Sequence, residues 1–320
     1  MSFSPKSAIR ALLATAMGRR VFILGSLALI GPLVGCRSSH VAKEHPEIPG
    51  FIYLGTNEAE LHEYRHQQTG IEFVLLTGGS FLMGGTPEEH ARVLAAVPAE
   101  GKALLGEEIV EDIARELEAE TPLRRIRVGA FLMGKHEVRQ REWSRIQEAL
   151  DAGYGADSDL PVSGVSLRDC QAFLSRTRPR LGLPSEAQWE YACRGGGASA
   201  YGFGDELSQE AANYGGSAMG QVLPDAGLVA VDRFRPNGFG LFGFHGNVGE
   251  WCQTVDGARD DAAESGETDP VAATPNVAVV RGGGFLSSAA DCRCASRQVY
   301  PPEWRQEDIG FRVVFTEIPD

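Results

Sequence analysis

Apolar positions first gather in one run near the start of the chain, Val21–Val34, which follows a segment with four basic residues and no acidic one. Gly25, Gly31 and Pro32 interrupt the run. A membrane-spanning helix needs about 20 consecutive apolar residues, and this run is shorter. Its length and its basic flank predict instead the apolar core of a secretory signal peptide over residues 1–35.

The apolar run ends in Leu33-Val34-Gly35-Cys36. This ending resembles the lipobox of bacterial lipoproteins, which implies that Cys36 is lipidated and becomes the first residue of the mature chain. The alternative is a plain signal peptide with an incidental cysteine. Arg19-Arg20 leaves both general and twin-arginine export open, and Met17 is an alternative start.

Residues 36–70 are polar and show no clear hydrophobic period, which predicts a lipid-anchored tether and an N-terminal extension. From Ile71 the pattern changes to short β-rich runs. Ile71–Thr77 turns at two glycines into Ser80–Met83, and Arg125–Val138 is predicted to form a second strand pair. The main domain is therefore expected to cover residues 71–320.

The segment between these strand pairs, residues 86–120, is acidic and has a helical pattern. Thr86 followed by Pro87 is typical of a helix start. Ile109, Ile113 and Leu117 recur every four residues, so one helix face is expected to be buried. The segment is interpreted as a helical insertion.

Three further helices are predicted, at Gln140–Leu150, Ser166–Arg176 and Ser185–Cys193, the last two with Ser166 and Ser185 as N-caps. The chain also contains 39 glycines in 320 residues, against an average of about 7%. Beyond Gly195 glycine, proline and short apolar pieces dominate, which predicts ordered turns and loops.

Charge and cysteine content limit the function. The chain has a net charge of −13, and removal of the four basic residues of the signal would make it −17. An acidic chain argues against nucleic acid as a partner. Five cysteines remain beyond Cys36, so at least one is free, metal-bound or paired with another chain.

Several motifs follow one another in a particular order: Glu137–Trp143, Leu183–Gly196, Asn237–Trp251 and the segment from Arg281 to Arg312 that contains R-G-G-G, C-x-C and G-F-R. Together they resemble the formylglycine-generating enzyme family, also called sulfatase-modifying factors. The resemblance implies an α+β fold that is rich in loops, a variant of the C-type-lectin-like fold. Three buried tryptophans, Trp143, Trp189 and Trp251, are expected in its core.

Enzymes of this family oxidise a sulfatase cysteine to formylglycine with O₂ and a Cu(I) held by two cysteines. The resemblance places Cys294 and Arg297 in the R-C-A-x-R context of one copper ligand, and Ala289 where the second cysteine is expected five residues earlier. Cys292 is the possible substitute, because residues two apart in a strand share a face and soft thiolates suit Cu(I). Three readings stay open for Cys292 and Cys294: buried packing residues, a metal or redox pair, or a working oxidase with displaced ligands.

The resemblance also implies calcium sites. One would use Gly246, Val248 and Glu250, with Gly243 in the place of a side-chain ligand, and the other would use Asn213, Tyr214 and Asp225. Calcium prefers six to eight oxygen ligands, so the missing side chain at position 243 predicts weak binding. Hydrogen bonds that brace the loops without metal are the alternative role for Asn213 and Glu250. His136 and His245 are expected to be surface or packing residues.

Two functions remain. The first is a lipid-anchored envelope protein whose domain is a non-catalytic platform for binding a protein or peptide partner, exported and held by its anchor to a bacterial membrane, the outer membrane being slightly favoured by Arg37 after Cys36. The second is a formylglycine-generating oxidase acting on exported sulfatases. Calcium is a possible cofactor of both, and copper belongs only to the enzyme.

Overall fold

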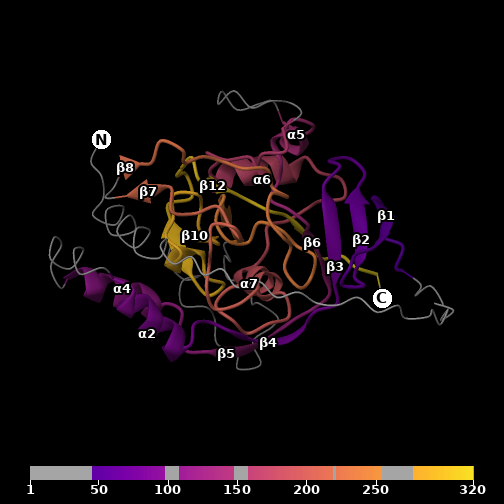
Figure 1. The fold of residues 1–320 in the computed structure, drawn as a ribbon. Coiled ribbons are helices and arrows are strands. Elements are labelled where there is room, and N and C mark those ends of the chain that lie inside the picture. The colour runs from indigo at the N-terminus through magenta and orange to yellow at the C-terminus, as the bar shows by residue number, and fades with distance from the viewer. Residues whose placement is uncertain (1–44, 98–107, 148–157, 219–220, 254–276, 320) are drawn as a thin grey trace, which may run out of the picture.

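The computed structural model describes residues 45–97, 108–147, 158–218, 221–253 and 277–319 (Figure 1). The predicted signal peptide, Cys36 and the acidic loop 256–275 lie outside these residues. Among the helices in the described ranges, none combines the length and the apolar content that a membrane span requires.

A five-stranded antiparallel sheet lies at one end of the molecule (Figure 1). Its strands, in spatial order, are β1 (Phe51–Thr56), β2 (His62–His66), β3 (Glu72–Leu76), β6 (Phe131–Gly134) and β13 (Val314–Phe315). The predicted domain start at residue 71 is wrong, because β1 and β2 belong to this sheet. The hydrophobic pattern of β2 is weak, because its buried residues are Tyr64 and His66 and not aliphatic side chains.

A second sheet of four strands is built almost entirely from the C-terminal third of the chain. Its spatial order is β11 (Arg297–Tyr300), β10 (Ala278–Arg281), β9 (Gly249–Trp251) and β12 (Ile309–Gly310), with β12 parallel to β9. Two small sheets complete the strands: β4 (Gly79–Met83) with β5 (Arg124–Val128), and β7 (Ser217–Ala218) with β8 (Gln221–Val222). The two strands of Arg125–Val138 do not pair with each other as predicted, because β5 pairs with β4 and β6 pairs with β3.

The helices begin where the capping residues predict. In α2 (Pro87–Ala95), α6 (Leu167–Ser175) and α7 (Glu186–Arg194), the side chains of Thr86, Ser166 and Ser185 each accept a hydrogen bond from the third helical residue. The predicted helix Gln140–Leu150 is shorter, since α5 covers only Gln140–Trp143, and residues 148–157 lie outside the described part.

The described parts of the predicted insertion, residues 86–97 and 108–120, contain two helices, as expected. α2 and α4 (Glu108–Glu118) project from the side of the molecule away from β1 (Figure 1). Val93 and Val97 pack with Ile113 and Leu117 in a small core of their own. The insertion is thus a helical hairpin with its own apolar contacts.

The main core is aromatic, and the three predicted core tryptophans are fully buried. Trp143 stacks on Phe173 at 5.2 Å between ring centroids. The core also contains charged side chains in direct pairs: Arg281 donates to Glu190 at 2.6 Å, and Arg312 donates twice to Glu250. Buried pairs of this kind cost desolvation when they form, but removal of one partner leaves an uncompensated charge.

Candidate functional site

The segment between Ser287 and Arg297 carries the cysteines that the sequence singled out, and a short turn sets their directions. Ala290–Cys292 form a 3-10 helix, η1, and the backbone becomes extended at Arg293. Ser288 braces the turn through a hydrogen bond from its hydroxyl to Asp291 at 2.8 Å. The same-face geometry expected for Cys292 and Cys294 in a strand is therefore absent here, and their side chains enter different clusters.

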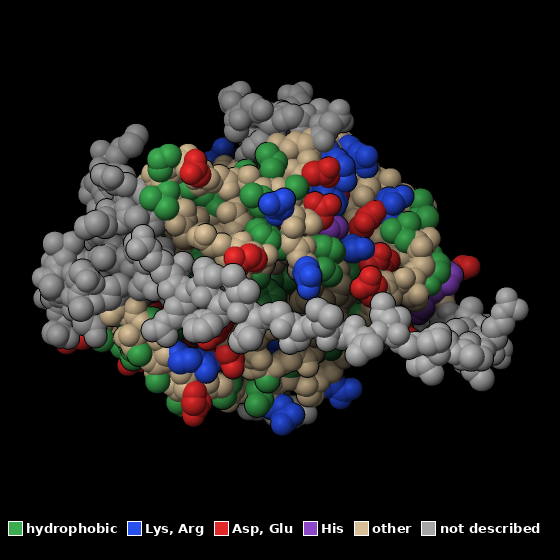
Figure 2. Space-filling view, in the orientation of Figure 1, with side chains coloured by type: hydrophobic (Ala, Val, Ile, Leu, Met, Phe, Trp, Pro, Cys, Tyr) green, Lys and Arg blue, Asp and Glu red, His purple; other side chains and the backbone are tan. Residues whose placement is uncertain are grey.

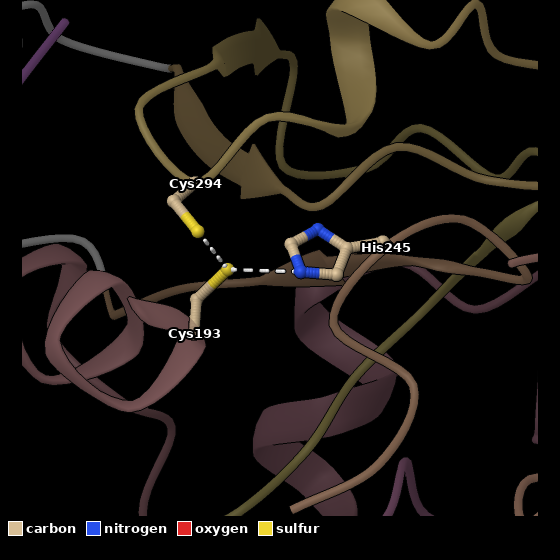
Figure 3. Close-up of side chains that lie close together, drawn as sticks. All are labelled: Cys193, His245 and Cys294. Atoms are coloured by element: carbon tan, nitrogen blue, oxygen red, sulfur yellow. Dashed lines mark hydrogen bonds between the residues drawn. The ribbon is translucent and has the colours of Figure 1, made fainter. Parts of the chain in front are cut away.

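Cys294 lies against Cys193, which was not among the residues predicted for the site. Its Sγ is 2.8 Å from the Sγ of Cys193, which lies in the last turn of α7 (Figure 3). The Nε2 atom of His245 is 3.9 Å from the Cys193 Sγ. Among the residues that the structure describes, this is the one group of three His, Cys, Asp or Glu donors whose ligand atoms all lie within 4.8 Å of one another.

Two hydrogen bonds fix the tautomer of His245. Its Nδ1 is 2.8 Å from the carbonyl oxygen of Cys292, which can only accept, and its Nε2 accepts the amide of Gly202 at 3.0 Å. The ring is therefore neutral with its proton on Nδ1. Burial lowers the pKa of His245 to about 4, in spite of the hydrogen bond to Cys292, which acts to raise it.

The cluster is closed to solvent. Both cysteine side chains are fully buried, and His245 is 7% exposed. The turn Tyr201–Gly204 covers it, because the rings of Tyr201 and Phe203 both contact the imidazole edge to face. Burial raises the pKa of the Cys193 thiol well above its usual value, and the adjacent Cys294 raises it further. The Cys193 thiol is thus held in its neutral form.

Cys292 lies elsewhere, beside Ser287. Both side chains flank Gly283: a Cβ added there would lie 2.9 Å from the Cys292 Sγ and 3.0 Å from the Ser287 Cβ. Cys292 packs with Ala289, Tyr201 and Tyr214. These two side chains have the five-residue spacing that the family resemblance assigns to the copper ligands, so the neighbour of Cys292 at that spacing is a serine.

Neither pair of positions considered from the sequence, 289 with 294 or 292 with 294, can hold copper between two thiolates. Cys292 and Cys294 enter different clusters, and Ala289 packs with Cys292 rather than with Cys294. Arg297, the third residue predicted for the reaction, donates its Nε to Glu186 at 2.9 Å. It is therefore held in an ion pair that anchors β11 to α7.

The side chain predicted to bind calcium at the Gly246–Glu250 loop already has hydrogen-bond partners within the protein. Glu250, the one side-chain ligand retained on the Gly246–Glu250 loop, accepts hydrogen bonds from Trp189 at 2.6 Å and from Arg312 at 2.7 Å through each carboxylate oxygen. A cation there would have to displace the guanidinium. Glu250 therefore braces β9 against Trp189 and Arg312, and the amide of Gly246 donates to the carbonyl of Gly282 at 2.9 Å.

Asn213 is also engaged as a brace. Its side-chain amide donates to the carbonyl of Gly227 at 2.9 Å and to Asn247 at 3.2 Å. Tyr214 donates its hydroxyl to the carbonyl of Leu207, and Asp225 is exposed. The two contacts of the Asn213 amide give this residue the loop-bracing role.

The structure explains why position 243 is a glycine. Its φ is +70°, and a Cβ there would overlap the carboxyl group of Glu137. Glu137 is fully buried; its Oε1 accepts from Asn247 at 3.0 Å, and its Oε2 has no hydrogen-bond partner. Burial raises the pKa of Glu137 to about 8, and nearby Glu250 adds to the shift.

Comparison with protein families gives a match over residues 58–317 to the model of the sulfatase-modifying factor enzyme 1-like domain. The formylglycine-generating enzyme of Mycobacterium tuberculosis is 30% identical over 292 residues, which cover 76% of this chain and 97% of that enzyme. The mouse enzyme of the same name is 30% identical over 194 residues, 57% of this chain and 51% of the mouse protein, so this chain spans about half of that relative. Serine/threonine-protein kinase pkn1 of Chlamydia pneumoniae is 29% identical over 80% of this chain but only 39% of its own length.

Solved structures show the same fold. PvdO from Pseudomonas aeruginosa superposes with a TM-score of 0.58 at 22% identity and covers 84% of this chain and 98% of its own. Treponema denticola variable protein 1 superposes with a TM-score of 0.54 at 19% identity over 79% of this chain and 98% of its own. The predicted α+β class is confirmed.

Proposed function

Because the chain belongs to the sulfatase-modifying factor enzyme 1-like domain family, we propose that it uses this fold as a non-catalytic platform for binding a protein or peptide partner. One observation carries the proposal. Neither five-residue pair in the η1 segment offers two thiols: Cys292 has Ser287 as its neighbour, and Cys294 has Ala289 at that spacing while its side chain contacts Cys193.

The reaction of the family requires a copper ion, the substrate sulfur and O₂ to be held together within a fraction of an ångström. A single thiolate at Cys292, itself 0% exposed under Tyr201 and Tyr214, supplies neither the second ligand nor access for a peptide. The match to part of a protein kinase supports the same idea, since it places this domain in a protein with a different named activity.

The experiment is a turnover assay of the full-length, reduced protein with copper, air and a C-x-P-x-R peptide, with the mycobacterial formylglycine-generating enzyme as the positive control. We expect no conversion of the peptide cysteine, measured by mass spectrometry. Conversion that disappears in Cys292→Ala would replace the platform proposal with the oxidase.

We also propose that the protein is exported and anchored through a lipid on Cys36. The support is the lipobox-like Leu33–Cys36 after a short apolar run. Cys36→Ala is expected to release the protein from membranes or leave it unprocessed. Unchanged membrane fractionation, together with no lipid on the Cys36 peptide by mass spectrometry, would contradict the anchor.

A further inference from the structure

We propose that four arginines around the turn between β2 and β3 form a docking face for the anionic headgroups of the membrane in which Cys36 is anchored. The four, which we call the arginine cluster, are Arg145, Arg176, Arg178 and Arg180, and all their side chains are exposed. The inference rests on the proposed lipid anchor, because it concerns how the anchored domain lies on its membrane.

The turn at residues 67–70 brings one side of the cluster together. The side-chain amide of Gln68 donates to the carbonyl of Arg176 at 3.2 Å, and its oxygen accepts the backbone amide of Arg178 at 2.6 Å. Arg180 follows two residues later, after a proline. The segment that leaves α6 is thus fastened to the β2–β3 turn.

The fourth arginine reaches the same turn from the segment after α5. Arg145 donates its Nη1 to the carbonyl of Thr69 at 2.9 Å. A Cβ at Gly70 would overlap the Arg145 guanidinium, so this side chain lies directly against the turn. Blue Lys or Arg side chains gather in this region, at the upper right of the view between α6 and the five-stranded sheet (Figure 2).

The cluster is not neutralised by acidic residues in the described part of the chain. None of its four arginines makes an ion pair there, whereas Arg65 of β2 pairs with Glu72 at 2.9 Å. The chain as a whole has a net charge of −13, so the cluster is a local patch of opposite sign. Charges more than about 8 Å apart are largely screened at physiological salt, and a ligand at the patch therefore responds mainly to its arginines.

Folding explains only part of the cluster. Arg178 caps the end of α6, because its Nη1 donates to the carbonyls of Ser175 and Thr177 at 2.8 and 2.7 Å. The side chains of Arg176 and Arg180 have no hydrogen-bond or ion-pair partner among the residues that the structure describes. These two side chains are therefore available to a ligand.

The position of the cluster points to the membrane as that ligand. The carbonyl of Gly50 accepts the amide of Gln67 at 2.9 Å, and a Cβ at Gly50 would overlap Pro179, which lies inside the cluster. His45, where the described chain begins, is five residues before Gly50. The nine residues from Cys36 to His45 span at most about 30 Å. The cluster thus lies where the chain from the anchor enters the domain.

Arginine suits a phosphate headgroup, because its guanidinium donates two parallel hydrogen bonds to phosphate oxygens. Each basic side chain near an anionic lipid surface raises the partition constant about fivefold. Four such side chains contribute on the order of several hundredfold. The anchor already holds the domain at a high effective concentration near the surface. The cluster therefore sets the orientation of the domain, while the anchor supplies the attachment.

The test is amide hydrogen exchange of the full-length protein purified from membranes, after mass spectrometry of the Cys36 peptide. The protein is reconstituted into vesicles of phosphatidylcholine alone or of an equal mixture with phosphatidylglycerol. We expect exchange in residues 67–70 and 176–180 to be about fivefold slower or more in the anionic vesicles, and high salt to remove the difference. Exchange in β4 and β5 should be the same in both.

Two double variants separate the cluster from charge in general. Arg176→Gln with Arg180→Gln removes no contact between described residues, and it should abolish the slower exchange, since two factors of about five are lost. Arg125→Gln with Arg127→Gln is the matched control. It removes two exposed arginines of β5, on the lower side of the molecule (Figure 1), and should keep the slower exchange.

The outcomes distinguish the docking face from the anchor. Equal exchange in the two kinds of vesicle, with lipid present on Cys36, would overturn the docking face and leave the anchor. A Cys36 peptide without lipid would overturn both. Slower exchange that persists in the Arg176→Gln, Arg180→Gln variant would also overturn the face. Slowing by a soluble polyglutamate peptide, but not by anionic vesicles, would assign the cluster to an acidic protein segment instead.

Discussion

The carboxylate of Glu120 accepts two hydrogen bonds from the guanidinium of Arg293, at 2.7 and 2.8 Å, although 173 residues separate them. Glu120 follows the inserted helical hairpin, and Arg293 directly follows Cys292. His90 of α2 adds a third contact to the same carboxylate at 3.1 Å. Burial alone would raise the pKa of Glu120, but Arg293 and His90 hold it below its usual value. The insertion is thus bound to the segment that contains the cysteines.

Removal of one partner of the Glu120–Arg293 pair is expected to cause a large loss of stability. Arg293→Met should lower the free energy of unfolding by about 3–5 kcal/mol, because it leaves a buried carboxylate without its counter-charge. Urea unfolding measures the loss, and faster amide hydrogen exchange in α2 and α4 would locate it. Arg115→Met is the control, since its pair with Asp112 is exposed and worth at most about 1 kcal/mol. Equal losses in the two variants would contradict the prediction.

Because Ser287 and Cys292 lie side by side, a cysteine at position 287 is expected to create a Cu(I) site with Cys292. Ser287→Cys should raise the affinity for Cu(I) at least about tenfold, because two thiolates side by side suit this ion. Competition with a chromophoric Cu(I) chelator measures it. Ser287→Ala is the matched control and should give no increase, because it changes the same side chain without adding a thiol. An equal increase in both variants would show that the added thiol is not responsible, and no increase in Ser287→Cys would contradict the predicted pair.

Glu250 predicts little response to calcium. Both of its carboxylate oxygens are bonded to Arg312, and the acid is 1% exposed. Micromolar calcium or a chelator should therefore shift the Tm by less than about 1 °C, because only tight binding to the folded state stabilises it. Differential scanning fluorimetry is sufficient. Stabilisation by several degrees would mean that calcium displaces the guanidinium.

Glu137 predicts a stability that falls as pH rises. Its pKa in the folded protein is about 8, against an ordinary value of 4.5, so the folded state holds a proton that the unfolded state releases. The contribution of this group to the free energy of unfolding is therefore largest below pH 4.5. It decreases between pH 4.5 and 8 by on the order of 1.4 kcal/mol per pH unit.

Glu137→Gln should flatten this dependence, because the amide mimics the protonated acid. Urea unfolding at pH 5.5, 7 and 8.5 measures it, and the exposed Glu58→Gln serves as the control. An unchanged pH slope in Glu137→Gln would show that another group is responsible.

Local signals in the sequence predicted the elements well where a side chain acts on its own neighbours. The caps Thr86, Ser166 and Ser185 marked three helix starts correctly, because each hydrogen bond is made within four residues. Strand pairing was harder. The segment Arg125–Val138 contains two strands, β5 and β6. Their partner residues lie 41 to 183 residues away, in β4, β3 and β13, and no local pattern encodes that choice.

The candidate site was predicted only in part. Cys294 was selected and its partner was missed, because Cys193 lies in a helix and gave no short motif with it. The odd number of cysteines was the one available signal that pairing mattered. His245 looked like an isolated residue because its contacts, Gly202, Phe203 and the carbonyl of Cys292, are contributed by other loops.

The strand β13 has a consequence for biosynthesis. Val314 and Phe315 complete the five-stranded sheet against β6, and Ile309 and Gly310 complete the other sheet against β9. Both sheets are therefore completed only by residues that are synthesised after all their other strands. The domain cannot acquire its native contacts progressively from its N-terminus during translation, and a nascent chain stalled before residue 309 would present two incomplete sheet edges to chaperones and proteases.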